Sequence, residues 1–340
     1  MRLAIVAEKP SLLDAFAPLL PEFFPQTDFT RTPVFYPISG WYVGSAKRFR
    51  LPRGLKWSDL PFISPTSYKR ISFSEARAQM GVRKLVGKPS SMTEADAEQA
   101  FAEADVILAL GDASYGGAHL AHRFISDALG YFPNDRVLFP IVWNVSEREL
   151  RKALSEMRLF ENFALPWVEQ GEIRRYFDYN FLSNAIPILG AAAREAMLLG
   201  GFVPSKYSLQ LLYDVRDTGQ MSDGQRISRM YSWKGTGKYK TEDDFYGLGS
   251  PTSQHQLILE LESAGALERV NRIETLITKA GMRFLDLLHP DCRDPDLPIR
   301  LHQWSRMPGL EARQKIDRYI CTFFGKQKKF FAKAQNSTSA

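Results

Sequence analysis

The sequence lacks any long apolar run and has few cysteines. No stretch approaches the roughly 20 consecutive apolar residues that a helix needs to span a bilayer, so we expect no membrane segment and no membrane partner. The two cysteines, Cys292 and Cys321, are too few for a disulfide framework and lack the paired spacing of metal ligands. These absences make a reducing cytoplasm the simplest setting for the protein.

The first residues show no cleavage-site pattern. Residues 2–7 (RLAIVA) form a short apolar run followed at once by charged residues, which predicts a buried first strand rather than a signal peptide. We find no internal repeat and no low-complexity tract. A hydrophobic fraction of 44% and a charged fraction of 24% are ordinary for a globular protein, and the length of 340 residues suggests about two domains.

The small excess of basic residues favours a polyanionic partner. The net charge is +6 and the pI is about 9.2, so nucleic acid binding would gain from the release of counterions. Cations alternate with aromatic residues at 325–333 (GKQKKFFAK), where Lys328 and Lys329 are candidates to hold phosphates. We assign residues 326–340 as a basic, disordered tail, although a solvated helix end before a shorter tail fits the same residues.

The first 145 residues have the pattern of a parallel α/β sheet. Two apolar runs, 2–7 and 105–110 (DVILAL), are typical of buried parallel strands, and the second leads through a glycine-rich acidic turn into a helix at about 118–129 and a strand at 137–142. Chemistry in such sheets gathers at the carboxyl ends of the strands. Glu8 and Asp112 each follow a strand end, so the two side chains could converge.

The rest of the chain is predicted to be mainly helical. Ser146 and Glu149 form a capping box that starts the first of these helices, so we place the domains at 1–145 and 146–325. Residues 216–246 are polar and poorly periodic, and we interpret them as a surface excursion. Residues 254–288 then have the order helix, turn, strand, helix, which outlines a winged-helix-like unit.

Several short motifs occur in one order along the chain. They are AEKPS at 7–11, WYVG at 41–44, LKWSDLPFISP at 55–65, PSKYS at 204–208 and GLGSPTS at 247–253. This ordered set resembles the type IA DNA topoisomerases over most of residues 1–310. The resemblance implies an α/β TOPRIM (Rossmann-like) domain followed by a mainly α-helical domain with winged-helix-like features, a topoisomerase core without its arch.

The acidic turn departs from the family pattern. The family uses three carboxylates there to hold Mg²⁺, and the matching positions here are Asp112, Ser114 and Gly116. With Glu8, the chain keeps enough carboxylates for a weak magnesium site only. His119 and His122 on the following helix could join a different metal site, but two histidines at this spacing are more often structural.

The family's nucleophile is also missing from its expected place. Family members cut DNA with a tyrosine in a Tyr-x-Arg-Thr-Asp motif on a gate, whereas only residues 209–246 separate Ser208 from the late glycine motif here. No tyrosine in that stretch precedes such a motif. Tyr231 remains a candidate for a relocated nucleophile flanked by cations at 226, 229 and 234, although an aromatic anchor of a loop is the simpler interpretation.

The resemblance therefore implies DNA binding without strand cleavage. We expect the chain to bind single-stranded DNA as a component of a DNA-processing or mobile-element assembly, with a protein partner supplying missing domains. Arg194 is the candidate for the arginine that the family places on its DNA-facing helix, which would fall near Pro187. The other candidate DNA contacts implied by the resemblance are Lys9, Ser11, Gly249, Thr252, Ser253 and Gln254.

Three alternatives remain open from the sequence. The first is a TOPRIM nuclease or phosphodiesterase in which Glu8 and Asp112 hold Mg²⁺ and water. The second is a type IA topoisomerase whose gate and tyrosine come from a partner. The third is a structural subunit in which protein fills the former DNA groove.

Overall fold

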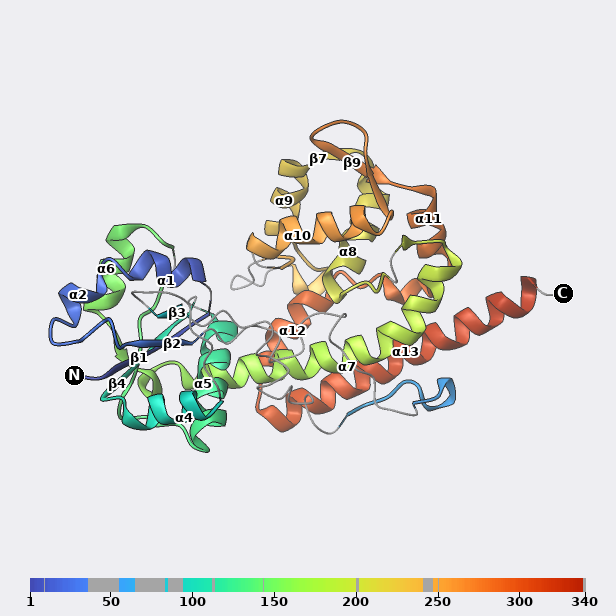
Figure 1. The fold of residues 1–340 in the computed structure, drawn as a ribbon. Helices are drawn as coiled ribbons and strands as arrows, with labels where there is room; N and C mark the ends of the chain where they lie inside the picture. The colour runs from blue at the N-terminus through green and yellow to red at the C-terminus, as the bar shows by residue number, and fades with distance from the viewer. Residues whose placement is uncertain are drawn as a thin grey trace. The chain divides into compact units, whose positions relative to one another are not determined.

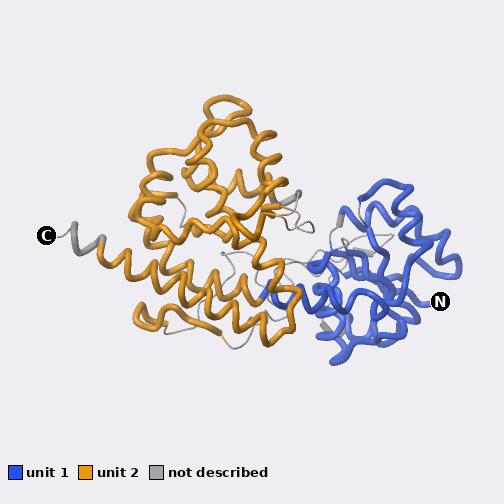
Figure 2. The backbone as a smooth tube through the Cα atoms, turned by 180° about the vertical axis from the view of Figure 1, so that it is seen from behind, with its two compact units in different colours: residues 1–48, 68–175 blue, residues 49–67, 176–340 orange. Residues whose placement is uncertain are grey.

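A computed structural model of the chain describes most of its residues. The described ranges are 1–8, 10–35, 55–64, 83–84, 94–111, 114–142, 144–199, 202–240, 247–249 and 251–338, with backbone alone for residues 10, 83–84, 94–95, 251–253 and 334–338. The chain divides into two compact units (Figure 2). Unit 1 is Met1–Arg48 with Tyr68–Arg175, and unit 2 is Phe49–Ser67 with Tyr176–Ala340.

Unit 1 is built on a mainly parallel sheet of order β3-β2-β1-β4-β5-β6. Its parallel strands are β1 (Leu3–Ala7), β2 (Pro33–Phe35), β4 (Val106–Leu110) and β5 (Val137–Phe139). The short edge strands β3 (Arg83–Lys84) and β6 (Arg158–Leu159) pair antiparallel. The prediction of an α/β unit with a parallel sheet is confirmed at this level.

Helices cover both faces of this sheet (Figure 1). Ala4 and Val6 of β1 pack toward α4 (Glu94–Glu103) and α5 (Tyr115–Leu129). The alternate residues of β1 pack toward α1 (Pro10–Phe16), α2 (Leu20–Phe23) and α6 (Glu147–Ser155). Successive strand side chains point to opposite faces, so both sets are buried and the strand is continuously apolar.

The boundary between the units differs from the predicted one. It lies at Arg175, within α7 (Leu165–Glu195), rather than at residue 145. Residues 146–175 stay with unit 1 because Leu150 and Leu154 of α6 enter its core and β6 pairs with β5. The short helix η3 (Phe160–Asn162) adds Phe160 to the core on the other face.

In unit 2, α7 runs beside the long C-terminal helix α13 (Gly309–Thr338), as Figures 1 and 2 both show. Phe181 of α7 lies 5.8 and 5.2 Å from the rings of Phe323 and Phe324. Apolar side chains continue along α13 as far as Phe331, which is buried. The prediction of a disordered tail from residue 326 is wrong for residues 326–338, which continue α13, and buried Phe331 packs the first part of this stretch.

A segment before the main helices of unit 2 is tied to α7 by two asparagines. This segment, residues 55–64, contains the short helix η2 (Trp57–Asp59). The Asn184 side chain accepts from the Phe62 N–H and donates to the Phe62 carbonyl oxygen, both at 2.7 Å. Asn180 accepts from the Ser64 N–H at 2.8 Å. Water cannot reach the two asparagine side chains because both are buried, so the backbone of the segment supplies their hydrogen-bond partners.

The remaining part of unit 2 combines short helices with a small antiparallel sheet. Its sheet has the order β7-β9-β8. In chain order the elements are α8 (Lys206–Thr218), β7 (Met221–Ser222), α9 (Asp223–Tyr231), η5 (Gly237–Tyr239), α10 (Pro251–Ser263), β8 (Leu267–Arg269), β9 (Glu274–Ile277), α11 (Lys279–Asp286), η6 (Pro290–Cys292) and α12 (Leu297–Ser305). Unit 2 is thus mainly helical, as expected.

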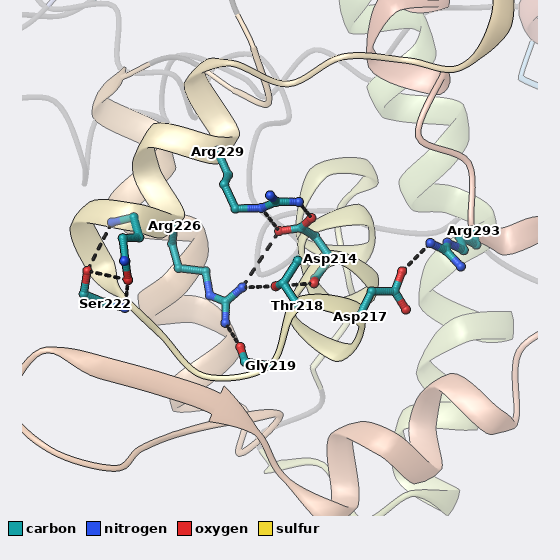
Figure 3. Close-up of polar contacts among 9 residues, drawn as sticks. Asp214, Asp217, Thr218, Gly219, Ser222, Arg226, Arg229 and Arg293 are labelled. Carbon is teal, nitrogen blue, oxygen red and sulfur yellow. Dashed lines mark hydrogen bonds and ion pairs between the residues drawn. The ribbon is translucent and has the colours of Figure 1, made fainter.

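The interpretation of residues 216–246 as a surface excursion is wrong where the structure describes them. Ser222 and Gln225 form a capping box that starts α9. Arg226 and Met230 of this helix are buried. Arg226 donates to the Thr218 hydroxyl at 2.7 Å and to the Gly219 carbonyl oxygen (Figure 3). Polar composition concealed the helix because its main buried side chain is charged.

None of the helices within the described residues is long and apolar enough to cross a membrane.

Replacing Asn184 with alanine should destabilise unit 2. The Asn184→Ala change removes both bonds to Phe62 and leaves backbone groups without these partners, which should lower the free energy of unfolding by about 2–3 kcal/mol. Ser183→Ala is the matched control. Among the described residues its hydroxyl bonds to Tyr179 of its own helix, and its loss should cost under about 1 kcal/mol. Urea unfolding measures both changes, and equal losses in the two variants would show that the asparagine bonds do not anchor the segment.

Candidate functional site

The carboxyl ends of β1 and β4 form one edge of the unit 1 sheet. Ala7 of β1 pairs with Leu110 of β4, and the N–H of Glu8 donates to the Leu110 carbonyl oxygen at 2.8 Å. Glu8 is partly buried, and the chain after Leu110 continues through Gly111 to Asp112. Asp112 and Lys9 lie outside the described residues. The predicted meeting of Glu8 with Asp112 therefore stays a prediction.

The turn after β4 is shaped by packing. A Cβ on Gly111 would lie 3.3 Å from Gly117 Cα and 3.3 Å from the Phe139 ring, so glycine allows β4 and α5 to approach closely. Ser114 is the N-cap of α5, and its hydroxyl accepts from the Gly117 N–H at 3.2 Å. This residue thus has a structural role where the family would place a carboxylate. Ser11 is exposed within α1.

The two histidines of α5 lie in apolar surroundings. Burial lowers the pKa of His119 to about 3, and the nearby Arg175 adds to the shift. His122 stacks on Phe132 with ring centroids 4.3 Å apart, and burial lowers its pKa as well. Both imidazoles are therefore neutral near pH 7. Among the residues that the structure describes, no group of three histidine, cysteine, aspartate or glutamate side chains could hold a metal ion.

The late glycine motif forms a turn between α9 and α10. Gly247 has φ +89°, and a Cβ there would overlap the Met230 carbonyl oxygen. The N–H of Leu248, whose side chain is buried, donates to the same oxygen at 2.7 Å. Residue 247 must be glycine because its φ is positive and because a Cβ would overlap the Met230 oxygen. The turn fixes where α10 begins relative to α9.

The DNA-contact candidates that follow this turn differ in their surroundings. Gln254 is 1% exposed, and its amide donates to the Gly249 carbonyl oxygen at 3.4 Å. In this position its side chain supports the turn rather than a ligand. Gly249 is partly exposed with φ +84°. Thr252 and Ser253 lie in the first turn of α10, and their side chains lie outside the described residues.

The exposed face of α10 and the following hairpin carry little positive charge. The sequence of α10 contains no lysine or arginine, and its exposed side chains within the described range include Gln256 and Glu260. In the β8–β9 hairpin, Arg269 is paired with Asp223 at 3.1 Å and with a glutamate of α10. Arg272 at the hairpin tip is exposed beside two exposed apolar residues, 270 and 273.

Tyr231 lies at the end of α9 and is 59% exposed. The arginines expected to flank it point elsewhere, because Arg226 and Arg229 both extend toward Asp214 of α8 (Figure 3). Arg229 donates to the two carboxylate oxygens of Asp214 at 2.7 and 3.2 Å. The idea of a tyrosine activated by these two arginines has no support in this arrangement.

The three remaining basic candidates also have different surroundings. Lys328 donates to the carbonyl oxygens of Leu60 and Ser58 at 2.8 and 3.3 Å, so it helps to hold residues 55–64 on α13. Lys329 is exposed on the same helix. Arg194 is exposed in the last turn of α7. Lys328 is therefore engaged in contacts within unit 2, and a DNA contact by Lys329 stays a prediction.

Sequence reasoning missed a cluster of ion pairs around α8. Asp214 and Asp217 lie three residues apart on this helix, and Arg293 donates to Asp217 (Figure 3). The two arginines of α9 are also three residues apart. Two helices with opposite charges at this spacing could have been predicted to face each other. Nothing in the sequence pairs Arg293 with a residue so far along the chain.

Comparison with models of known protein families and with curated proteins found no match to this chain.

Unit 1 should lose stability on acidification because His119 is held neutral. Its pKa is lowered to about 3 in the folded chain from an ordinary value of 6.5, so the unfolded chain binds a proton first as the pH falls below 6.5. The free energy of unfolding that depends on neutral His119 is fully present above pH 6.5. About 2 kcal/mol of it should be lost between pH 7 and pH 5. Urea unfolding at both pH values, with hydrogen exchange in β1 and β4 as the report on unit 1, measures this loss.

The His119→Leu variant is the control for that measurement. It places an apolar side chain of similar length in the core and removes the titrating imidazole. Its unit 1 should lose about 2 kcal/mol less than the parent over the same pH interval. An unchanged pH dependence in the variant would assign the acid sensitivity to other groups.

Proposed function

We propose that this chain binds single-stranded DNA through unit 2 and does not cut it. The observation that carries the proposal is the order α8, β7, α9, α10, β8, β9 with its sheet order β7-β9-β8. This is the connectivity of a winged helix, in which α9 and α10 correspond to a helix-turn-helix pair and the β8–β9 hairpin to the wing. Helix-turn-helix units place their second helix against nucleic acid.

The charge on α10 favours a single strand over a duplex. A helix that enters the major groove is usually accompanied by lysine and arginine side chains that neutralise phosphates on both sides. The sequence of α10 offers none and includes Glu260 and Glu262. A single strand can instead be bound by the N–H groups at the start of α10. The resemblance to type IA topoisomerases points to the same region.

The proposal of binding without cleavage rests on the residues of the turn after β4 and of the chain before Gly247. The position of one expected carboxylate is occupied by Ser114, which caps α5. No tyrosine in 209–246 has the family's surrounding motif. On the TOPRIM-like interpretation of unit 1, Glu8 and Asp112 would hold Mg²⁺ weakly. We further propose that the chain works with a protein partner that supplies the chemistry on the strand.

Fluorescence anisotropy with single-stranded and duplex oligonucleotides tests this function. We expect the single strand to bind more tightly than the duplex. The logarithm of its binding constant should fall linearly with the logarithm of the salt concentration, with a slope of about 0.7 per phosphate neutralised. Affinity should not require Mg²⁺, and the same DNA should remain intact on a gel. Absence of binding to any oligonucleotide at low salt would contradict the proposal.

The same samples test the enzymatic alternative. Mg²⁺-dependent nicking that disappears in the Glu8→Gln variant would replace the binding function with that of a TOPRIM nuclease. Nicking that persists in Glu8→Gln would point to a contaminant rather than to this site. Parallel samples with duplex DNA show whether binding and nicking prefer a single strand.

A negative charge at the start of α10 should weaken binding. The Ser253→Glu variant places a carboxylate where the proposed strand approaches, and repulsion of phosphates should lower affinity about 10-fold, equivalent to about 1.4 kcal/mol. Glutamate in a first helical turn is compatible with helix stability. Ser263→Glu adds the same charge at the exposed other end of α10 and should change affinity less than twofold. Equal effects of the two variants would show that overall charge, rather than this helix start, governs binding.

A further inference from the structure

A cavity of about 350 Å³ lies in unit 2 beside α8. Its walls come from α8 between Gln210 and Asp217, from the end of α9 with the chain that follows it, and from Arg293 and Pro295. This volume is at the lower end of the range for small-molecule pockets, about 300–1,000 Å³. A ligand of the size of one nucleotide is therefore appropriate, and a larger one would extend into solvent.

Hydrogen bonds between distant segments hold the cavity walls in place. Gln210 of α8 donates to the Cys292 carbonyl oxygen at 3.0 Å and accepts from the Asp294 N–H at 2.8 Å. Trp233 donates from its ring nitrogen to the Pro295 carbonyl oxygen at 2.9 Å. A binding site whose walls are fixed in this way loses little conformational entropy when it is filled.

Three cations face the cavity with donors to spare. Arg229 uses Nε and Nη2 on Asp214, and Arg293 uses Nη2 on Asp217. The two arginine side chains are still 47% and 52% exposed. Within the part of the chain that the structure describes, the Nη1 groups of these arginines and the Lys234 ammonium have no hydrogen-bond acceptor. These donors suit the oxygens of a phosphate.

The two carboxylates of the cavity are already neutralised. Asp214 is paired with Arg229 and also lies 3.9 Å from Arg226 behind it. Asp217 is paired with Arg293 and with Arg216, the latter at 3.3 Å. An anion in the cavity therefore meets more cations than carboxylates. Figure 3 shows Arg229 of α9 and Arg293 reaching toward α8 from two separate segments.

We propose that this cavity binds one nucleotide. Its phosphate would be held by Arg229, Lys234 and Arg293, and its base would pack against Trp233, which lines the cavity together with Tyr213. Cations beside an aromatic surface are the combination that binds nucleotides of single strands. A free nucleoside monophosphate and one nucleotide within a DNA strand offer the same chemistry. This site lies beyond the proposed contact at α10 and does not depend on it.

Binding of defined ligands to the full chain tests the proposal. Calorimetric titration with thymidine 5′-monophosphate, thymidine and inorganic phosphate separates the contributions of base and phosphate. We expect the monophosphate to bind at least 10-fold more tightly than either fragment. Anisotropy with a labelled thymidine oligonucleotide then tests whether a strand uses the same cavity.

Paired charge variants locate the site. Lys234→Gln with Arg293→Gln should weaken monophosphate binding at least 10-fold. The control Arg148→Gln with Lys152→Gln removes the same two charges from the exposed surface of α6 and should change binding less than twofold. Lys234→Glu alone should weaken binding at least fivefold, and its exposed position makes it the usable variant if the double change impairs folding.

The outcomes separate this site from the proposed function. Weaker binding of both monophosphate and oligonucleotide in the Lys234 and Arg293 variant supports a site for a strand nucleotide, and loss of monophosphate binding alone supports a site for a free nucleotide.

Oligonucleotide binding by a parent protein that does not bind monophosphate overturns the cavity site and leaves single-strand binding intact. Binding of a hexaglutamate peptide in place of the monophosphate also overturns it. Monophosphate binding without oligonucleotide binding supports the cavity and contradicts the function proposed for unit 2.

Discussion

The buried guanidinium of Arg226 is the interaction on which the strand-containing part of unit 2 depends. This side chain is 1% exposed, and burying a charge is unfavourable unless it is paired and hydrogen-bonded. Thr218, Gly219 and Asp214 supply the partners from the end of α8 and the turn after it. These contacts dock α9 on the end of α8. Burial lowers the pKa of Arg226, and the charge of Asp214 opposes that shift.

This docking determines the positions of the elements that the proposed functions use. The end of α9 presents the Met230 carbonyl oxygen to Leu248, and this bond starts the turn that leads into α10. On the other side, Asp214 orients Arg229 at the wall of the cavity. The helix start proposed to contact DNA and the cavity proposed to bind a nucleotide thus share α9 as a common support. A fold places such groups, but their chemistry, rather than the fold, argues for function.

Much of the fold could be predicted from local patterns. The runs at 2–7 and 105–110 are strands because a sheet covered on both faces requires continuous apolar residues. The helix predicted at 118–129 forms as α5, and its N-cap Ser114 extends it by three residues. The predictions failed where burial involved charged or distant partners. The basic composition after residue 326 suggested disorder, yet Phe331 keeps that stretch of α13 packed.

The candidate site shows the same division. Glu8 was placed correctly at a strand end by the apolar run before it, because the end of a strand is a local property. The roles of Lys328, Gln254 and Arg293 depend on partners from distant segments or on the turn geometry, which composition does not reveal. The sequence by itself determined the strands at 2–7 and 105–110, the helix near 118–129 and the carboxylates that follow those strands. Only the tertiary structure decided which charged side chains are buried in pairs and which line a cavity, because a charge is stable inside a protein only beside partners that folding brings from elsewhere in the chain.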